Sequence, residues 1–316
     1  METSALTVDV TPTPWTGRFD GDGDEHRRWW QAVAPHTAEA SAGALRPAVV
    51  LGFCSDAGVR RNKGRVGAAA APAAIRSALG PLAFHLDRDL FDAGDVIVED
   101  DSLEAGQERA GRAISALLDG GNLTVVLGGG HETAFASYLG VAGSDAVRSG
   151  QRLGVLNLDA HFDLRDDATP SSGTPFLQMA QEEAAAGREL QYAVVGISEP
   201  NNTRTLFDTA DRLGVKYLLD ELCSPEAVEI FVADFLAGID VLYLTIDLDV
   251  LPASVAPGVS APAAYGVPLP AISAVCKQVA ASGKLLHLDV AELNPEFDID
   301  ARTAKVAARL VNTLLA

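Results

Sequence analysis

The stretch LGVLNLDAHFDLR at residues 153–165 runs from an apolar segment straight into alternating polar residues. The segment up to Leu158 is almost continuously apolar, as in strands that are buried on both faces. Asp159, His161 and Asp163 then take every second position, and in a strand such positions share one face. A solvent-exposed strand would alternate from its start, so the pattern favours a buried strand that ends in a functional site.

The same pattern recurs at two other strand ends. TIDLDV (245–250) places Asp247 and Asp249 on one face, and LTVVLGGG (123–130) leads directly into His131. In open α/β sheets the ligand site lies outside the carboxyl edge of the sheet, so we expect these groups to converge. The predicted metal ligands are His131, Asp159, His161, Asp163, Asp247 and Asp249.

This set of side chains predicts two metal ions. Burying unpaired carboxylates costs several kcal/mol each, roughly, so that many together require cations. A set of mostly oxygen ligands with two nitrogens and no sulfur favours Mn²⁺ over Zn²⁺ or copper. Four acidic and two neutral ligands balance two divalent ions. We expect Asp159 and Asp247, each first in its run, to bridge them.

The rest of the chain alternates short apolar runs with longer amphipathic ones. Strands are predicted at residues 47–53, 123–129, 153–160, 192–198, 241–250 and 284–293, with weaker candidates at 95–98 and 215–219. The alternation predicts an α/β fold with a mostly parallel sheet and helices on both faces. We expect a polar N-terminal lead over residues 1–45 and one catalytic domain over residues 46–316. His287 is expected to be a hydrogen-bonded core residue.

Composition excludes several partners. The 43 acidic against 24 basic residues give a net charge of −19, which disfavours nucleic acid and anionic membranes. Three dispersed cysteines argue against a disulfide framework or a thiolate zinc site and fit a reducing compartment. The N-terminus lacks the pattern of a signal peptide, and the apolar runs are too short to span a bilayer. We expect a cytoplasmic protein that acts on a small molecule.

Four motifs, in this order along the chain, resemble the arginase/agmatinase (ureohydrolase) superfamily: GGGHE (128–132), NLDAHFDLR (157–165), TIDLDV (245–250) and DVAELNP (289–295). The resemblance implies a three-layer αβα sandwich of the arginase type. It also implies a dinuclear Mn²⁺ site whose shared hydroxide attacks the carbon of a guanidinium or amidine. By position, the superfamily's ligands fall on the six residues above. Glu292 matches its acid that pairs with the cationic substrate group, a task suited to a carboxylate.

The chain departs from the better-known members at SSGTPF (171–176), where Ser172 stands in place of a histidine proton shuttle. A water held by Ser172, or the leaving group itself, would then take the proton. Together with GGGHE, residues 56–68 and residues 201–215, this motif resembles the formimidoylglutamase branch. The branch implies hydrolysis of N-formimidoyl-L-glutamate to L-glutamate and formamide, in histidine degradation. Because the superfamily commonly forms trimers and hexamers, a homo-oligomer is expected.

The two carboxylates of that substrate need local cations, because the field of a −19 protein repels anions. The densest basic stretch, residues 60–65, follows the first strong strand at the same sheet edge, and residues 201–204 follow the strand at 192–198. Solvated loop charge is the alternative for each of these residues. The predicted substrate-binding residues are Arg60, Arg61, Asn62, Arg65, Asn201 and Arg204.

Two other functions stay open. One is a different ureohydrolase, such as an agmatinase or guanidinobutyrase that releases urea, but its substrate would leave the Arg/Asn loops idle. The other is a non-catalytic metal-binding protein on this fold. The filled ligand positions and Glu292 argue against that alternative.

Overall fold

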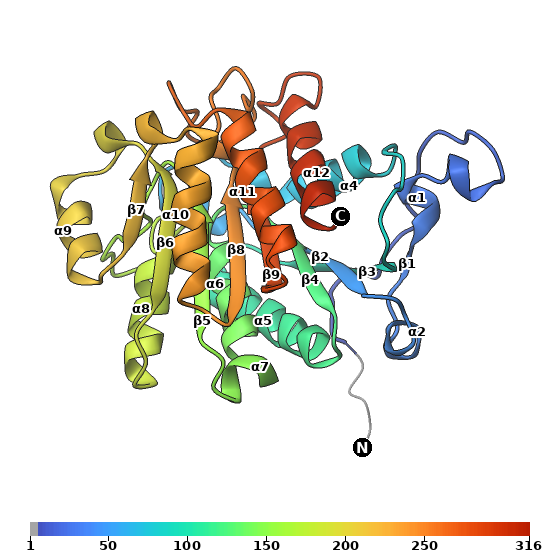
Figure 1. The fold of residues 1–316 in the computed structure, drawn as a ribbon, viewed down its shortest axis with the longest axis horizontal. Helices are drawn as coiled ribbons and strands as arrows, with labels where there is room; N and C mark the ends of the chain where they lie inside the picture. Colours follow the sequence, from blue (N-terminus) through green and yellow to red (C-terminus); the bar gives the residue numbers. More distant parts are fainter. Residues whose placement is uncertain (1–5) are drawn as a thin grey trace.

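The computed structural model describes residues 6–316 and arranges them around one central sheet (Figure 1). Within these residues the sheet has nine strands, all parallel, in the order β1-β3-β2-β4-β9-β8-β5-β6-β7. The strands are β1 (Val33–Pro35), β2 (Ala48–Cys54), β3 (Leu90–Ile97), β4 (Leu123–Leu127), β5 (Leu153–Leu158), β6 (Gln191–Ile197), β7 (Lys216–Leu219), β8 (Val241–Asp247) and β9 (Leu285–Ala291). The predicted parallel α/β sheet is confirmed.

Helices cover both faces of the sheet, which completes the expected three layers. One face carries α4 (Ala71–Leu79), α10 (Pro225–Ala237), α11 (Leu269–Ala281) and α12 (Arg302–Leu314). The other carries α5 (Leu103–Asp119), α6 (Thr133–Ala142), α8 (Pro175–Ala185) and α9 (Arg204–Arg212). None of the helices between residues 6 and 316 has the length and apolar composition that crossing a membrane requires.

Shorter helical segments lie in the connections. The α-helical ones are α1 (Trp29–Ala32), α2 (Ala38–Ala42), α3 (Ala57–Arg61) and α7 (Asp145–Arg148). The 3₁₀ segments are η1 (Asp24–His26), η2 (Ala68–Ala70), η3 (Glu199–Asn201), η4 (Asp220–Leu222) and η5 (Leu248–Val250). Among them, α3 and η5 matter for the site, because α3 begins three residues after the end of β2 and η5 follows β8 directly.

The eight predicted strands are all present, and the structure adds a ninth. Strand β3 begins at Leu90, five residues before the predicted start, and β1 was not predicted at all. β1 is three residues long, largely exposed and ends in Pro35, so it carries no buried apolar run to detect. Proline is tolerated there because β1 pairs only with β3, at the edge of the sheet.

The order of the strands brings the polar motifs together. Strands β4, β9, β8 and β5 are consecutive neighbours in the middle of the sheet, and nearly all their residues are buried. Because all four are parallel, their carboxyl ends share one edge. That edge carries His131 after β4, Glu292 after β9, Asp247 at the end of β8 and Asp159 after β5.

His287 in β9 is a buried polar group away from this edge. It is fully buried, and its Nδ1 lies 2.6 Å from the Thr124 hydroxyl on β4, as expected for a core histidine. Its Nε2 has no hydrogen-bond partner among residues 6–316. Burial lowers the pKa of His287 to about 3, so the folded protein keeps this imidazole neutral.

We expect this buried imidazole to weaken the fold in acid. Below about pH 6.5 the unfolded chain binds a proton that the folded chain takes up only near pH 3, so stability falls over that window. Between about pH 7 and 4.5 the loss amounts to roughly 2–3 kcal/mol. Urea unfolding at both pH values should show a smaller loss for His287→Gln than for the wild type. Equal losses in the two proteins would contradict the assignment.

Candidate metal centre

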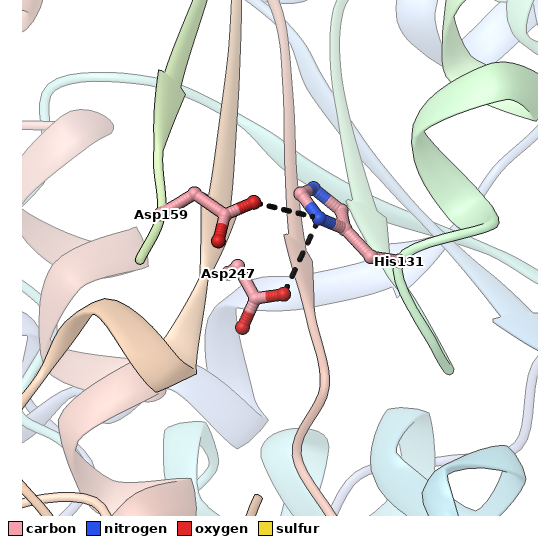
Figure 2. Close-up of side chains that lie close together, drawn as sticks. All are labelled: His131, Asp159 and Asp247. Carbon is pink, nitrogen blue, oxygen red and sulfur yellow. Dashed lines mark ion pairs between the residues drawn. The ribbon is translucent and has the colours of Figure 1, made fainter. Parts of the chain in front are cut away.

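The ring of His131 meets carboxylates from two other strands (Figure 2). Its Nδ1 lies 3.1 Å from Oδ2 of Asp159 and 3.2 Å from Oδ2 of Asp247. Oδ2 of Asp163 is closer still, at 2.9 Å. All of these groups are buried or nearly so, so a single nitrogen faces three carboxylates away from water.

A second group of ligand atoms forms around His161. Its Nδ1 lies 3.1 Å from Oδ2 of Asp249 and 3.5 Å from Oδ1 of Asp159. Two sets therefore have ligand atoms close enough together to hold an ion. They are His131 with Asp159 and Asp247, and Asp159 with His161 and Asp249. Because Asp159 belongs to both, the structure supports one shared ligand between two adjacent metal positions.

Local backbone structure fixes the ligands. Asp159 accepts a hydrogen bond from the backbone N–H of His161 at 2.6 Å, and Asp247 accepts one from that of Asp249 at 2.8 Å. In each motif the first aspartate thus orders the turn that carries the next ligand. Asp163 and Glu292 have φ of +49° and +68°, a conformation that costs energy in residues other than glycine and often marks functional sites.

The electrostatics of the cluster favour positive charge. Burial by itself would lower the pKa of His131 and His161, but the surrounding aspartates outweigh it and raise both well above the usual value. Burial would raise the pKa of Asp159, but the two histidines hold it below its usual value. Burial, then the neighbouring Asp249, raise the pKa of Asp247. Four acids this close require cations to stay ionised.

Hydrogen bonding shows that metal ions fit. The hydroxyl of Thr245 donates to Asp289 at 2.6 Å, so it accepts from His131 Nε2 at 3.0 Å. His131 therefore has a proton on Nε2, and its Nδ1 faces three carboxylate oxygens, a place where either a second proton, which the raised pKa favours, or a metal ion can lie. In addition, Oδ1 of Asp249 is buried without a hydrogen-bond partner in residues 6–316. Carboxylates this close together need protons on the imidazoles or bound cations between them, and oxygen-rich sets suit hard divalent ions.

A cavity of about 350 Å³ opens beside the cluster. Its lining includes five of the six candidate ligands, His131, His161, Asp163, Asp247 and Asp249, together with Glu292. It also includes polar and basic residues from four loops: Asn62, Lys63, Arg65, Arg165, Ser172, Asn201, Asn202 and Ser260. The cavity therefore combines candidate metal ligands with groups that suit an anion.

Glu292 lines the cavity beside the candidate ligands and is 5% exposed. Its Oε1 accepts the backbone N–H of His131 at 2.8 Å, while Oε2 has no hydrogen-bond partner within the described part of the chain. Burial, followed by the carboxylate of Glu132, raises the pKa of Glu292 to about 8. A cationic group in the cavity would stabilise the ionised form of Glu292 and give its free oxygen a donor.

Three of the predicted substrate-binding residues line this cavity: Asn62, Arg65 and Asn201. Asn62 donates to the hydroxyl of Ser172 at 3.0 Å, which places the predicted catalytic serine at the cavity wall. The guanidinium of Arg65 is held by the carbonyls of Val259 and Ser260 and lies over the ring of Phe297.

The other three predicted substrate-binding residues, Arg60, Arg61 and Arg204, do not line this cavity. Arg60 pairs with Asp56 at 3.0 Å on the outer side of α3, and Arg61 pairs with Asp101 at 2.9 Å and Glu104 at 2.6 Å. Arg204 lines a neighbouring cavity instead. The helical turns of α3 and α9 point these side chains away from the site, which a linear count of charges does not show.

Lys63 and Arg165 occupy the place in the cavity lining that was predicted for Arg60, Arg61 and Arg204. Both line the cavity, and neither has a carboxylate within ion-pair distance among residues 6–316. Lys63 follows α3 with φ of +62°, so the chain turns there towards the site. Arg165 continues the two-residue spacing of Asp159, His161 and Asp163, a signal that had been available in the sequence.

Comparison with known proteins agrees with this arrangement. The arginase family matches residues 46–316. The chain is 58% identical to a formimidoylglutamase of Nocardia farcinica, over 97% of each chain. It is 56% identical to one of Rhodococcus opacus, over 97% of this chain and 96% of the relative.

Among solved structures, a formiminoglutamase of Trypanosoma cruzi with Mn²⁺ superposes with a TM-score of 0.80 and 24% identity, over 92% of this chain and 97% of the other. At that identity the likeness speaks for the fold. The family match covers most of the chain, and the relatives match it nearly end to end. This chain is therefore a hydrolase, and it belongs to the arginase family.

Proposed function

We propose that this enzyme hydrolyses N-formimidoyl-L-glutamate to L-glutamate and formamide with two Mn²⁺ ions. The observation that carries the proposal is the mixed lining of one cavity, which holds an oxygen-rich cluster and Glu292 together with cations that form no ion pair within residues 6–316. The substrate has the matching polarity, with a cationic amidine at one end and two carboxylates at the other. Relatives named formimidoylglutamase, 46–58% identical over nearly the whole chain, support the same reaction.

The ions would be held by His131, Asp159, His161, Asp163, Asp247 and Asp249. When bound, they supply the Lewis acidity that activates water near neutral pH. Manganese fits the preponderance of oxygen ligands, and the Trypanosoma cruzi relative was solved with Mn²⁺. Asp159 reaches both histidines and is the proposed bridging ligand. Asp247, whose Oδ1 holds the turn to Asp249, is the second.

Glu292 is proposed to hold the amidine. Its unpaired Oε2 is the acceptor that a cationic N–H group needs, and charge-assisted bonds of this kind are about twice as strong as neutral ones. The bond from His131 N–H to Oε1 fixes the direction of the carboxylate. The amidine carbon is thereby oriented towards the candidate ligands, which line the same cavity.

The basic and amide residues of the cavity lining are proposed to bind the two carboxylates of the substrate. Arg165 and Lys63 supply charges that no acid in residues 6–316 neutralises within ion-pair distance, and Asn62 and Asn201 add amide donors. Arg65 shapes the wall, since its guanidinium is engaged by backbone carbonyls. These local cations overcome the repulsion that a −19 chain exerts on an anionic substrate.

Ser172 is proposed to assist proton transfer to the leaving nitrogen through a water molecule. Its hydroxyl accepts from Asn62 and is only 7% exposed, so its own O–H stays available to orient a water in the cavity. The pair Asn62–Ser172 joins the loop after α3 to the loop before α8, and both residues line the cavity.

The reaction is tested by its product. Purified enzyme loaded with Mn²⁺ should release formamide and glutamate from N-formimidoyl-L-glutamate, and negligible urea from agmatine or 4-guanidinobutyrate. Lys63 and Arg165 favour N-formimidoyl-L-glutamate, because agmatine and 4-guanidinobutyrate lack its pair of carboxylates. Urea as the main product would instead identify an agmatinase-like enzyme.

Removing the proposed shared ligand should empty both metal positions. Asp159→Ala deletes a carboxylate that contacts both histidines, so calorimetric titration with Mn²⁺ should show loss of both binding events. Asp167→Ala, which removes an exposed acid in the following loop, is the matched control and should bind two ions per chain. Retention of one tight ion in Asp159→Ala would refute the shared role.

Arg165 should determine substrate affinity. Loss of a charge-assisted hydrogen bond is worth about 1.5–3 kcal/mol, so Arg165→Ala should raise KM roughly 10- to 100-fold while kcat changes less than about threefold. Arg60→Ala, which removes a nearby arginine that faces away from the cavity, serves as the control and should leave KM unchanged. A larger effect at Arg60 than at Arg165 would reverse the assignment of the two residues.

A further inference from the structure

Glu132, the last residue of the motif GGGHE, has a fully buried side chain that the proposed reaction does not use. It stands between His131 and the first residue of α6, and it does not line the catalytic cavity. A buried carboxyl group needs hydrogen-bond donors, because burial without them costs free energy. The positions of those donors therefore indicate the task of this residue.

Both donors to Glu132 come from the segment that follows β2. Its Oε1 accepts the hydroxyl of Ser55 at 2.7 Å and the backbone N–H of Gly58 at 2.9 Å. The two bonds are buried and join residues that are 77 and 74 positions apart in the chain. We call this contact of Glu132 with Ser55 and Gly58 the α3 clamp, because it holds the first turn of α3 to the segment after β4.

The α3 clamp depends on glycine at two positions. A Cβ atom on Gly58 would lie 2.5 Å from Oε2 of Glu132, and one on Gly130 would lie closer still to the same atom. A side chain at either position would therefore force the two segments apart, since only glycine lets a backbone approach so closely. Two hydrogen bonds fix the carboxyl group, so it cannot turn aside without losing them.

The position of α3 determines where Asn62 and Lys63 lie. The backbone N–H of Asn62 donates to the carbonyl of Gly58 at 2.9 Å, and that of Lys63 donates to the carbonyl of Arg60 at 3.0 Å. The turn that brings Asn62 and Lys63 to the cavity lining is thus built on α3 itself. A shift of α3 would move both residues relative to the rest of the cavity.

The segment after β4 is held by bonds that do not involve the carboxyl group of Glu132. The backbone N–H of His131 donates to Glu292 at 2.8 Å, and its Nε2 lies 3.0 Å from the hydroxyl of Thr245. Gln107 on α5 donates to the backbone carbonyl of Glu132 at 2.9 Å. The candidate ligand His131 and Glu292 should therefore stay in place when the α3 clamp is broken.

We propose that Glu132 is a positioning residue that sets the separation between the amidine end and the carboxylate end of the substrate site. By holding α3 beside His131, it places Lys63 at a fixed distance from Glu292. This role rests on the proposed function, in which the loop after α3 binds the substrate carboxylates. Because small displacements of a binding group are costly, loosening the clamp weakens substrate binding while the reacting groups keep their geometry.

Removing the carboxyl group should change KM rather than kcat. Glu132→Ala leaves the donors of Ser55 and Gly58 without their acceptor, so KM for N-formimidoyl-L-glutamate should rise roughly tenfold while kcat changes less than about threefold. Glu132→Gln keeps one acceptor oxygen and should hold KM to within about threefold of the wild type. Both variants should bind as many Mn²⁺ ions as the wild type in calorimetric titration, which verifies that the ligands are folded.

Gly58→Ala disturbs the α3 clamp from the other side and keeps Glu132. Its methyl group would meet Oε2, so KM should rise here as well, although alanine favours a helix more than glycine does. Gly43→Ala is the matched control, because nothing lies within 4 Å of the added Cβ. That variant should keep the KM of the wild type.

A double-mutant cycle shows whether Glu132 acts through the loop after α3. In a Lys63→Ala background, Glu132→Ala should lower kcat/KM by less than about threefold, because the group that it places is already gone. In an Arg165→Ala background it should lower kcat/KM roughly tenfold again, since Arg165 belongs to the loop after β5 and the two effects should add.

Hydrogen exchange separates this inference from the proposed function. Residues 57–63 should exchange faster in Glu132→Ala than in the wild type or Glu132→Gln, whichever substrate the enzyme takes. If the wild type releases no formamide, the proposed function fails, and faster exchange at residues 57–63 still supports the α3 clamp. Unchanged exchange there, an unchanged KM in Glu132→Ala, a loss confined to kcat, or equal effects in the two backgrounds would each overturn the inference.

Discussion

Four aspartates meet at the carboxyl edge of the sheet with one buried and one half-buried imidazole, and the mutual repulsion of the carboxylates is the constraint that the structure has to satisfy. The strands behind them are apolar and closely packed, so neither water nor a distant counterion reaches the cluster from below. The backbone responds with two turns held by the aspartates themselves and with positive φ at Asp163 and Glu292. Positive charge in the cluster stabilises all of these features together, which is why the site fits divalent cations.

The pairing of charges also distinguishes the basic residues that line the cavity from those that do not. Arg60 and Arg61 follow β2, at the carboxyl edge of the sheet where the basic loop was expected, yet Asp56, Asp101 and Glu104 pair with them. Lys63 and Arg165 lack such partners within the described residues and line the same cavity as the candidate ligands. The cavity therefore brings basic side chains close to an acidic cluster, although the overall charge of the chain is strongly negative.

Much of this arrangement is predictable from the sequence, because it depends on short-range rules. An apolar run that ends in DxHxD has few interpretations in a parallel sheet, and the structure brings the six predicted ligands to one edge. Family membership and the α/β sheet are confirmed. The roles of the individual ligands, Glu292 and Ser172 stay predictions, as do the domain boundary at residue 46 and the cytoplasmic location. The substrate loops were harder to predict, since the direction of a side chain depends on whether its loop is helical, as at Arg60 and Arg204, or turns with positive φ, as at Lys63.

The position of β9 has a consequence for synthesis of the protein. This strand is the last in the chain, yet it pairs with β4 on one side and β8 on the other, in the centre of the sheet. A growing polypeptide on the ribosome therefore has its acidic residues at 159–163 and 247–249 exposed before the segment that closes the sheet has emerged. Until β9 is in place, His131 after β4 and Asp247 on β8 belong to two separate parts of the sheet, and a product lacking β9 would expose an open edge on each part to aggregation or proteolysis.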